Sequence, residues 1–140
     1  MKSTRLGTIL GTLGVWVIVG IFWYFATRNF HPTRRVALTV TISLVTAYAA
    51  AVYLNHLYLI PRFWERGSWP AYWSTLLAAM IAFTAVAVTI IRVSYIRVLG
   101  PDPDPNGLYI HFAIDFVGMI AHVLAAAGVV LAWNHFRRAK

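Results

Sequence analysis

Residues 71–91 read AYWSTLLAAMIAFTAVAVTII, and this stretch of 21 residues contains no charged side chain. A helix of about 20 predominantly apolar residues is long enough to cross the hydrocarbon core of a bilayer. The helix that begins here is expected to continue to about residue 98, and further apolar runs lie at about 6–26, 36–60 and 108–135. The sequence therefore predicts an all-α fold, an integral membrane four-helix bundle that forms a single transmembrane domain over residues 1–140.

The composition agrees with this class. Hydrophobic residues make up 60% of the chain and charged residues 11%, against about a quarter charged in an average soluble domain. The absence of cysteine excludes disulfides and thiolate metal sites. The net charge of +8 comes from basic residues that flank the apolar runs, so we expect lipid headgroups of the bilayer, and not nucleic acid, as their partners.

The distribution of basic residues predicts the orientation. Four crossings place both termini on one side, and the positive-inside rule assigns the more basic side to the cytoplasm. The side of the termini carries seven basic residues and the opposite side five. We therefore expect a multi-pass protein of a prokaryotic-type inner (cytoplasmic) membrane with both termini cytoplasmic.

A polar stripe runs along the fourth apolar run. His111, Asp115, Gly118 and His122 fall within about 60° of one helix face, and Asp115 is the only acid inside an apolar span. An ionisable residue at such a depth is a candidate functional site. Three interpretations stay open: a buried polar contact in which His111 bonds Asp115 with Arg92 or Arg97 nearby, a proton or ion pathway, and a cofactor site.

The cofactor interpretation involves a haem or a chlorophyll-type pigment. His111 and His122 lie 11 residues apart, which is about 16 Å along one helix and too far for both to ligate a single haem. A single-ligand contact through His122, or through His56 on the second run, stays open. No metal-binding motif supports a metal site.

Small residues indicate close helix packing. Gly7, Gly11 and Gly14 recur on the first run and Gly118 lies on the fourth, and small residues let helix backbones approach closely in a membrane. We expect packing inside the bundle, with dimerisation or docking to another subunit as the alternative. Motifs of soluble enzymes, such as a phosphate-binding glycine loop or a nucleophile elbow, are absent, so we expect no catalysis.

One resemblance concerns the end of the second run. Residues 53–64, YLNHLYLIPRFW, followed by Ala71 and Tyr72, resemble the N-x-x-x-L-I-P-R-F junction in the membrane domains of LytS/YehU-type sensor histidine kinases. The resemblance implies a multi-helix sensor-like membrane module with this junction on the cytoplasmic side. The chain has no phosphoacceptor His-Phe-x-Phe-Asn segment, so kinase activity is not implied.

These observations predict a non-catalytic membrane protein that acts as a sensory or accessory subunit through helix contacts with another membrane protein or with a second copy of itself. The first alternative is a haem- or (bacterio)chlorophyll-binding subunit of a respiratory or photosynthetic complex. The second is a small proton-coupled carrier, in which Asp115 would exchange the proton.

Overall fold

The computed structural model describes residues 2–101 and 107–138, and of residues 2–10, 131, 133–135 and 137–138 it describes only the helical backbone. Four long helices form in this part of the chain: α1 (Lys2–Thr27), α2 (Arg34–Leu54), α3 (Trp69–Leu99) and α4 (Gly107–Arg138). Two shorter elements lie between them, the 3₁₀ turn η1 (Arg28–Phe30) and the π-helix η2 (Asn55–Trp64). The predicted all-α four-helix bundle is confirmed.

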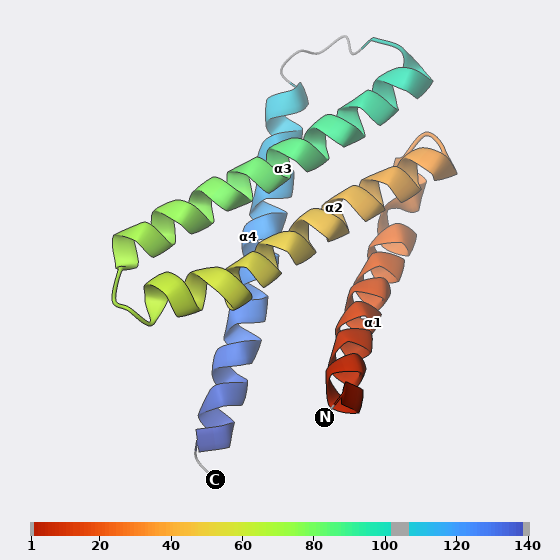
Figure 1. The fold of residues 1–140 in the computed structure, drawn as a ribbon. Coiled ribbons are helices and arrows are strands. Elements are labelled where there is room, and N and C mark those ends of the chain that lie inside the picture. The colour runs from red at the N-terminus through yellow and green to blue at the C-terminus, as the bar shows by residue number, and fades with distance from the viewer. Residues whose placement is uncertain (1, 102–106, 139–140) are drawn as a thin grey trace.

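The helices are arranged around α2, which contacts each of the other three. Figure 1 shows α2 and α3 side by side and antiparallel, with α4 crossing behind both and α1 running at an angle away from the first turns of α2. The first turn of α1 and the last turn of α4 lie at the same end of the molecule, which we name the terminal end. The last turn of α3 and the first turn of α4 lie at the opposite end.

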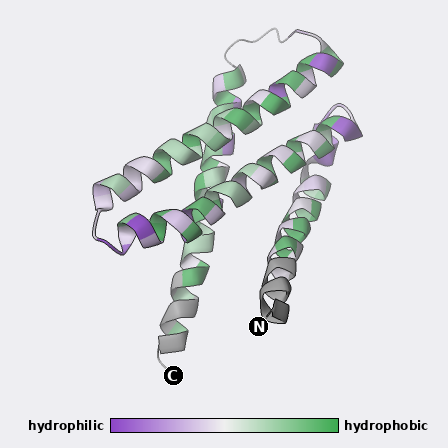
Figure 2. Cartoon of the chain, viewed as in Figure 1, coloured by the Kyte–Doolittle hydropathy of each residue, from purple (hydrophilic) through white to green (hydrophobic). Residues whose placement is uncertain are grey.

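The outer surface is apolar, as contact with lipid requires. Figure 2 shows hydrophobic residues along the helices and hydrophilic residues concentrated where the chain turns. Of the described residues, four helical spans are long and apolar enough to cross a membrane, and within the Gly11–Phe30 span no residue is buried inside the molecule. Side chains such as Ile18, 68% exposed, therefore face lipid. The chain is a multi-pass membrane protein.

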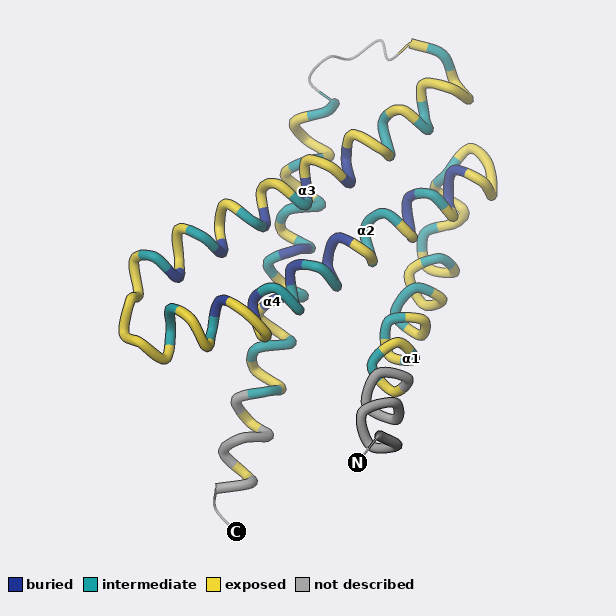
Figure 3. Tube along the Cα trace, in the orientation of Figure 1, coloured by how far each residue is buried: buried dark blue, intermediate teal, exposed yellow. Residues whose placement is uncertain are grey.

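The core lies where α2, α3 and α4 meet. Figure 3 shows the buried positions of α2 and α3 on the sides that face inward. The small residues Ala47 and Ala51 of α2 belong to this core. Larger side chains fill the remaining space, among them Met119 of α4, which is fully buried. Small residues permit close approach of helices in a membrane, so this part of the fold follows from the composition of α2.

The prediction that the second helix ends near residue 60 is wrong. The chain stays helical through Pro61 to Trp64, because residues Asn55–Trp64 have π geometry. Proline has no N–H and collides with the carbonyl four residues earlier in an α-helix. The wider π turn uses bonds to the fifth residue back, as in Glu65 N–H to Ile60 O at 3.0 Å. The connection to α3 therefore contains only residues 65–68.

Candidate functional site

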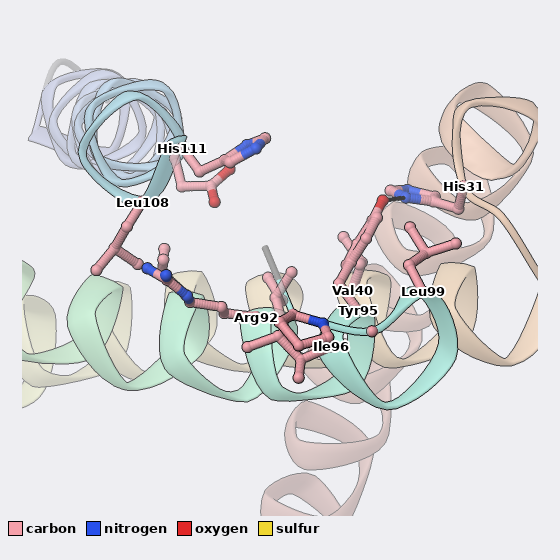
Figure 4. Close-up of a pocket in the computed structure, with 13 residues that line it drawn as sticks. His31, Val40, Arg92, Tyr95, Ile96, Leu99, Leu108 and His111 are labelled. Carbon is pink, nitrogen blue, oxygen red and sulfur yellow. Dashed lines mark hydrogen bonds between the residues drawn. The ribbon is translucent and has the colours of Figure 1, made fainter. Parts of the chain in front are cut away.

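A cavity of about 350 Å³ opens among α2, α3, α4 and the α1–α2 connection, at the end opposite the terminal end. Its polar lining consists of Arg92, Tyr95, His31, His111 and Asp115. Figure 4 shows His111 of α4 and Arg92 of α3 on one side, and His31 and Tyr95 joined by a hydrogen bond on the other. Apolar side chains such as Val40, Leu99 and Leu108 complete the wall. The volume is within the range of small-molecule sites.

The charged part of the cavity combines an acid with a guanidinium at similar depth. Asp115 lies eight residues from the start of α4 and Arg92 seven residues from the end of α3, which corresponds to about 10–12 Å below the helix ends at 1.5 Å per residue. His111 interacts electrostatically with Asp115 one turn away. Among the described residues Asp115 forms no hydrogen bond or ion pair, and its carboxylate lines the cavity.

The histidine on the opposite side of the cavity was not predicted as a site residue. His31 lies between η1 and α2, and its Nδ1 shares a hydrogen bond of 2.5 Å with the hydroxyl of Tyr95. The Nε2 atom of the same ring is buried and has no hydrogen-bond partner among the described residues. Burial lowers the pKa of His31 below its ordinary value, because desolvation disfavours the imidazolium. The ring therefore ties the α1–α2 connection to α3 in its neutral form.

A second polar cluster lies deeper, where α4 crosses α2. The ring of His122 stacks on Tyr48 at a centroid distance of 4.3 Å. Its Nδ1 donates to the carbonyl oxygen of Gly118 at 2.7 Å, since a carbonyl can only accept. Trp23 of α1 also lies beside the imidazole, at a centroid distance of 6.1 Å. His122 therefore joins three helices, and its Nε2 is the ring nitrogen left for a further partner.

The polar stripe of α4 is thus divided between two places. His111 and Asp115 line the cavity, whereas Gly118 and His122 contact Tyr48. Of the two arginines named as neighbours of Asp115, Arg92 lines the same cavity and Arg97 does not. His56 lies exposed on η2 and belongs to neither group. No group of three or more His, Cys, Asp or Glu side chains suited to a metal ion occurs in the described part of the chain.

Residues 53–64 form the end of α2 and the π-helix η2, which lead into the connection to α3. Asn55, the first residue of η2, is buried and accepts a hydrogen bond of 2.8 Å from the hydroxyl of Tyr72. Leu59 is fully buried. Trp64 packs against Trp69 and Tyr72, at centroid distances of 4.2 and 5.1 Å. The apolar and amide positions of the motif therefore hold the π-helix against α3.

Gly11 and Gly14 of α1 have open space beside them in the described part of the chain. A Cβ on Gly11 or Gly14 would meet no atom of the described residues within 4 Å. The structure therefore shows no packing partner for these two glycines among the described residues, and their role in helix packing, inside the bundle or with another subunit, stays a prediction. The surroundings of Gly7 lie outside the described residues. Gly118, by contrast, lies directly against Tyr48, whose hydroxyl would be 2.6 Å from a Cβ at that position.

Comparison with known proteins gives one relationship. No protein-family model matches the chain, and no solved structure matches it. The chain is similar to sodium-dependent phosphate transport protein 4 from Homo sapiens, with 24% identity over 137 residues, which is 96% of this chain and 30% of the transporter. The chain thus spans less than a third of the length of that relative. The similarity agrees with a membrane protein.

Proposed function

We propose that the chain is the membrane module of a sensory or accessory subunit that binds a small polar ligand in the cavity and performs no catalysis of its own. The observation that carries the proposal is the cavity itself, which Arg92, His111 and Asp115 line together with apolar side chains. Ligand sites in proteins are characteristically apolar cavities with a few convergent polar groups. The resemblance of residues 53–64 to the membrane domains of sensor kinases supports the sensory role.

The route from the cavity to the terminal end runs along α4. Asp115 lines the cavity, and Gly118 lies one turn further along, in contact with Tyr48 of α2. Helices shift by small rotations and translations when switching between states. A shift of α4 around a bound ligand would displace Tyr48, and would reach a partner through the remaining turns of the helix. In this proposal both termini are cytoplasmic and the cavity faces the outside of an inner membrane.

The role as a subunit is tested by extraction from native membranes in a mild detergent, followed by size-exclusion chromatography with light scattering. We expect a complex larger than one copy of the 15.7 kDa chain, either a homo-oligomer or an assembly with another membrane protein. A single copy at every protein concentration and in every mild detergent tested would contradict the proposal. An absorption spectrum of the same sample tests for a haem or pigment.

A carrier is the second candidate, and the similarity to the phosphate transporter favours it. The same cavity would then be a transport site that opens alternately to either side. Reconstitution of the chain into proteoliposomes with labelled phosphate inside tests this function. Sodium- or proton-driven phosphate flux that Asp115→Asn abolishes would establish the carrier and replace the sensory proposal. Absence of phosphate flux in the unmodified protein would contradict the carrier function.

A further inference from the structure

We propose that a groove between α1 and α2 binds one anionic phospholipid. One acyl chain of the lipid lies along the groove, and its phosphate contacts the arginines at the end of the groove opposite the terminal end, which are Arg28, Arg34 and Arg35. This site is separate from the cavity among α2, α3 and α4, because the two share no lining residue. The proposed function does not depend on it.

The groove has the dimensions of one lipid chain. It lies within the membrane-spanning parts of both helices, has a volume of about 420 Å³ and extends along α1 from Leu13 to Phe25. These 12 steps correspond to about 18 Å at 1.5 Å per residue, close to one leaflet of the roughly 30 Å hydrocarbon core. A second helix is about 10–12 Å across with its side chains, so it could only lie over the opening of the groove.

The walls of the groove suit a hydrocarbon chain. Aliphatic side chains of the lining include Leu13, Val17 and Ile21 of α1 and Leu38, Ile42 and Val45 of α2. Two polar groups of the lining are engaged within the molecule. The indole Nε1 of Trp16 donates to the hydroxyl of Tyr53 at 2.9 Å, and the hydroxyl of Thr41 donates to the carbonyl oxygen of Ala37 at 2.9 Å.

Gly20 keeps the middle of the groove open. It belongs to the lining, and it shares a face of α1 with Trp16 and Tyr24, one turn away on either side. A Cβ at this position would meet no described atom within 4 Å. A larger side chain here would therefore extend into the space of the lipid chain without displacing a neighbouring helix.

Three guanidinium groups lie at one end of the groove. The Cζ atom of Arg28 is 4.8 Å from the centroid of the Phe25 ring, which lines the groove. Arg34 and Arg35 begin α2, four and three residues before Leu38 of the lining, and residues at this spacing share a helix face. All three arginines are exposed. At the ends of membrane-spanning helices, they lie at the level of the lipid headgroups.

The charge at this end selects an anionic headgroup. The first acid of the sequence is Glu65, so α1, η1 and α2 carry no acid that could pair with the arginines. Guanidinium groups bind phosphate oxygens through paired hydrogen bonds, and basic sites between transmembrane helices bind anionic headgroups. A choline headgroup would bring a further cation beside the arginines, and like charges repel. A zwitterionic lipid should therefore bind more weakly.

The test is native mass spectrometry of the full chain in a mild detergent, with lipid added in increasing amounts. Dioleoyl phosphatidylglycerol is the anionic probe, and dioleoyl phosphatidylcholine has the same chains without net charge. Glycerol 3-phosphate carries the phosphate without chains and distinguishes a lipid site from a site for free phosphate. We expect one phosphatidylglycerol per chain, bound at least fivefold more tightly than phosphatidylcholine, and no competition from glycerol 3-phosphate.

One variant tests the groove. Gly20→Leu should weaken the binding of both lipids at least fivefold, because the leucine side chain fills the space of the acyl chain. Gly128→Leu is the matched control. A Cβ on Gly128 of α4 also meets open space, and this glycine lies outside the groove, so lipid binding should not change.

A second variant tests the charge. The double substitution Arg34→Gln with Arg35→Gln should reduce the preference for phosphatidylglycerol over phosphatidylcholine at least threefold, and should leave phosphatidylcholine binding unchanged. Arg62→Gln with Arg66→Gln removes the same charge from exposed positions near the connection between α2 and α3. This control should keep the full preference.

The proposal is overturned if phosphatidylcholine binds as tightly as phosphatidylglycerol, if glycerol 3-phosphate competes, or if Gly20→Leu leaves lipid binding unchanged. Unchanged lipid binding together with a smaller complex in Gly20→Leu would identify the groove as a contact with a second copy of the chain instead. If a variant does not fold, the comparison of the three probes on the unmodified chain decides. A monomeric chain that binds phosphatidylglycerol would support the lipid site and contradict only the proposed subunit role.

Discussion

The hydroxyl of Tyr48 on α2 lies in the space that a side chain on Gly118 of α4 would occupy. A Cβ built on Gly118 would be 2.6 Å from Oη and 3.4 Å from the ring carbon Cζ. Tyr48 is 6% exposed and stacks on His122, so its ring has little room to move. This contact sets how closely α2 and α4 cross, and it is the close approach that requires glycine at position 118.

Gly118→Ala should therefore destabilise the protein. The added methyl group must push Tyr48 off His122, and overpacking of this kind costs about 1–3 kcal/mol. Thermal unfolding in detergent, followed by circular dichroism, measures the effect. Gly128→Ala is the matched control, because a Cβ there would meet no described atom within 4 Å.

The double variant Gly118→Ala with Tyr48→Phe separates the clash from other effects. Removing the hydroxyl leaves the ring carbon at 3.4 Å from the new methyl group, which is ordinary contact. We expect the double variant to regain most of the lost stability relative to Tyr48→Phe alone. Equal losses from Gly118→Ala in the two backgrounds would show that the hydroxyl does not limit the approach of the helices.

The second prediction concerns the hydrogen bond at the turn between α2 and α3. Tyr72→Phe leaves the buried Oδ1 of Asn55 without its donor, and an unsatisfied buried polar group costs about 1–3 kcal/mol. Thermal unfolding should show the loss, and combining it with Asn55→Leu should recover part of it, because no polar atom is then left unpaired. Tyr58→Phe, on the exposed side of η2, should change the stability by less than about 0.5 kcal/mol.

The bundle was predictable because it depends on run length and composition. In lipid, an uninterrupted apolar segment such as residues 71–91 can form all its backbone hydrogen bonds within itself only as a helix. Each long apolar run therefore predicts one helix that crosses the membrane. The π-helix was not predictable, because Pro61 normally ends or kinks a helix. Its persistence depends on tertiary contacts of Asn55 and Leu59 with α3, and a single sequence does not reveal such contacts.

The candidate site was predictable only in part. Asp115 and His111 stood out because charge is rare in apolar runs, and the structure places both at the cavity. His31 gives no such signal, because it lies between the first two apolar runs. Its pairing with Tyr95 joins positions 64 residues apart, and helical periodicity carries no information about contacts between helices. For the same reason, the sequence could not predict that His111 and Asp115 line the cavity whereas Gly118 and His122 contact Tyr48.

The third prediction is a pH dependence of stability that originates at His31. Because burial lowers its pKa in the folded chain below 6.5, the unfolded chain binds the proton more readily in acid, and stability must fall as pH falls. The loss should begin below about pH 6.5, the ordinary value of histidine, and be complete below the folded-state pKa. More than about one pH unit above 6.5 this residue should contribute almost no pH dependence, because it is then neutral in both states.

Melting temperatures in detergent between pH 5 and 8 measure this effect. His31→Gln should remain able to bond Tyr95 but should flatten the profile, because the amide does not titrate. His56→Gln, at an exposed position of η2, is the matched control and should retain the acid-induced loss. An unchanged profile in His31→Gln would assign the pH dependence to other groups.

The last prediction concerns the free side of α1. A Cβ on Gly11 or Gly14 would meet no atom of a neighbouring helix within 4 Å among the described residues, so Gly14→Leu should leave the melting temperature of an isolated chain nearly unchanged. In a membrane, a stripe of small residues permits close approach of another helix, and leucine would block it. If the proposed subunit contact uses this side of α1, Gly14→Leu should reduce the size of the complex in mild detergent. Ile18→Leu is the control, because it replaces one large exposed side chain by another, and it should preserve the complex. A complex that survives Gly14→Leu would place the contact on another helix.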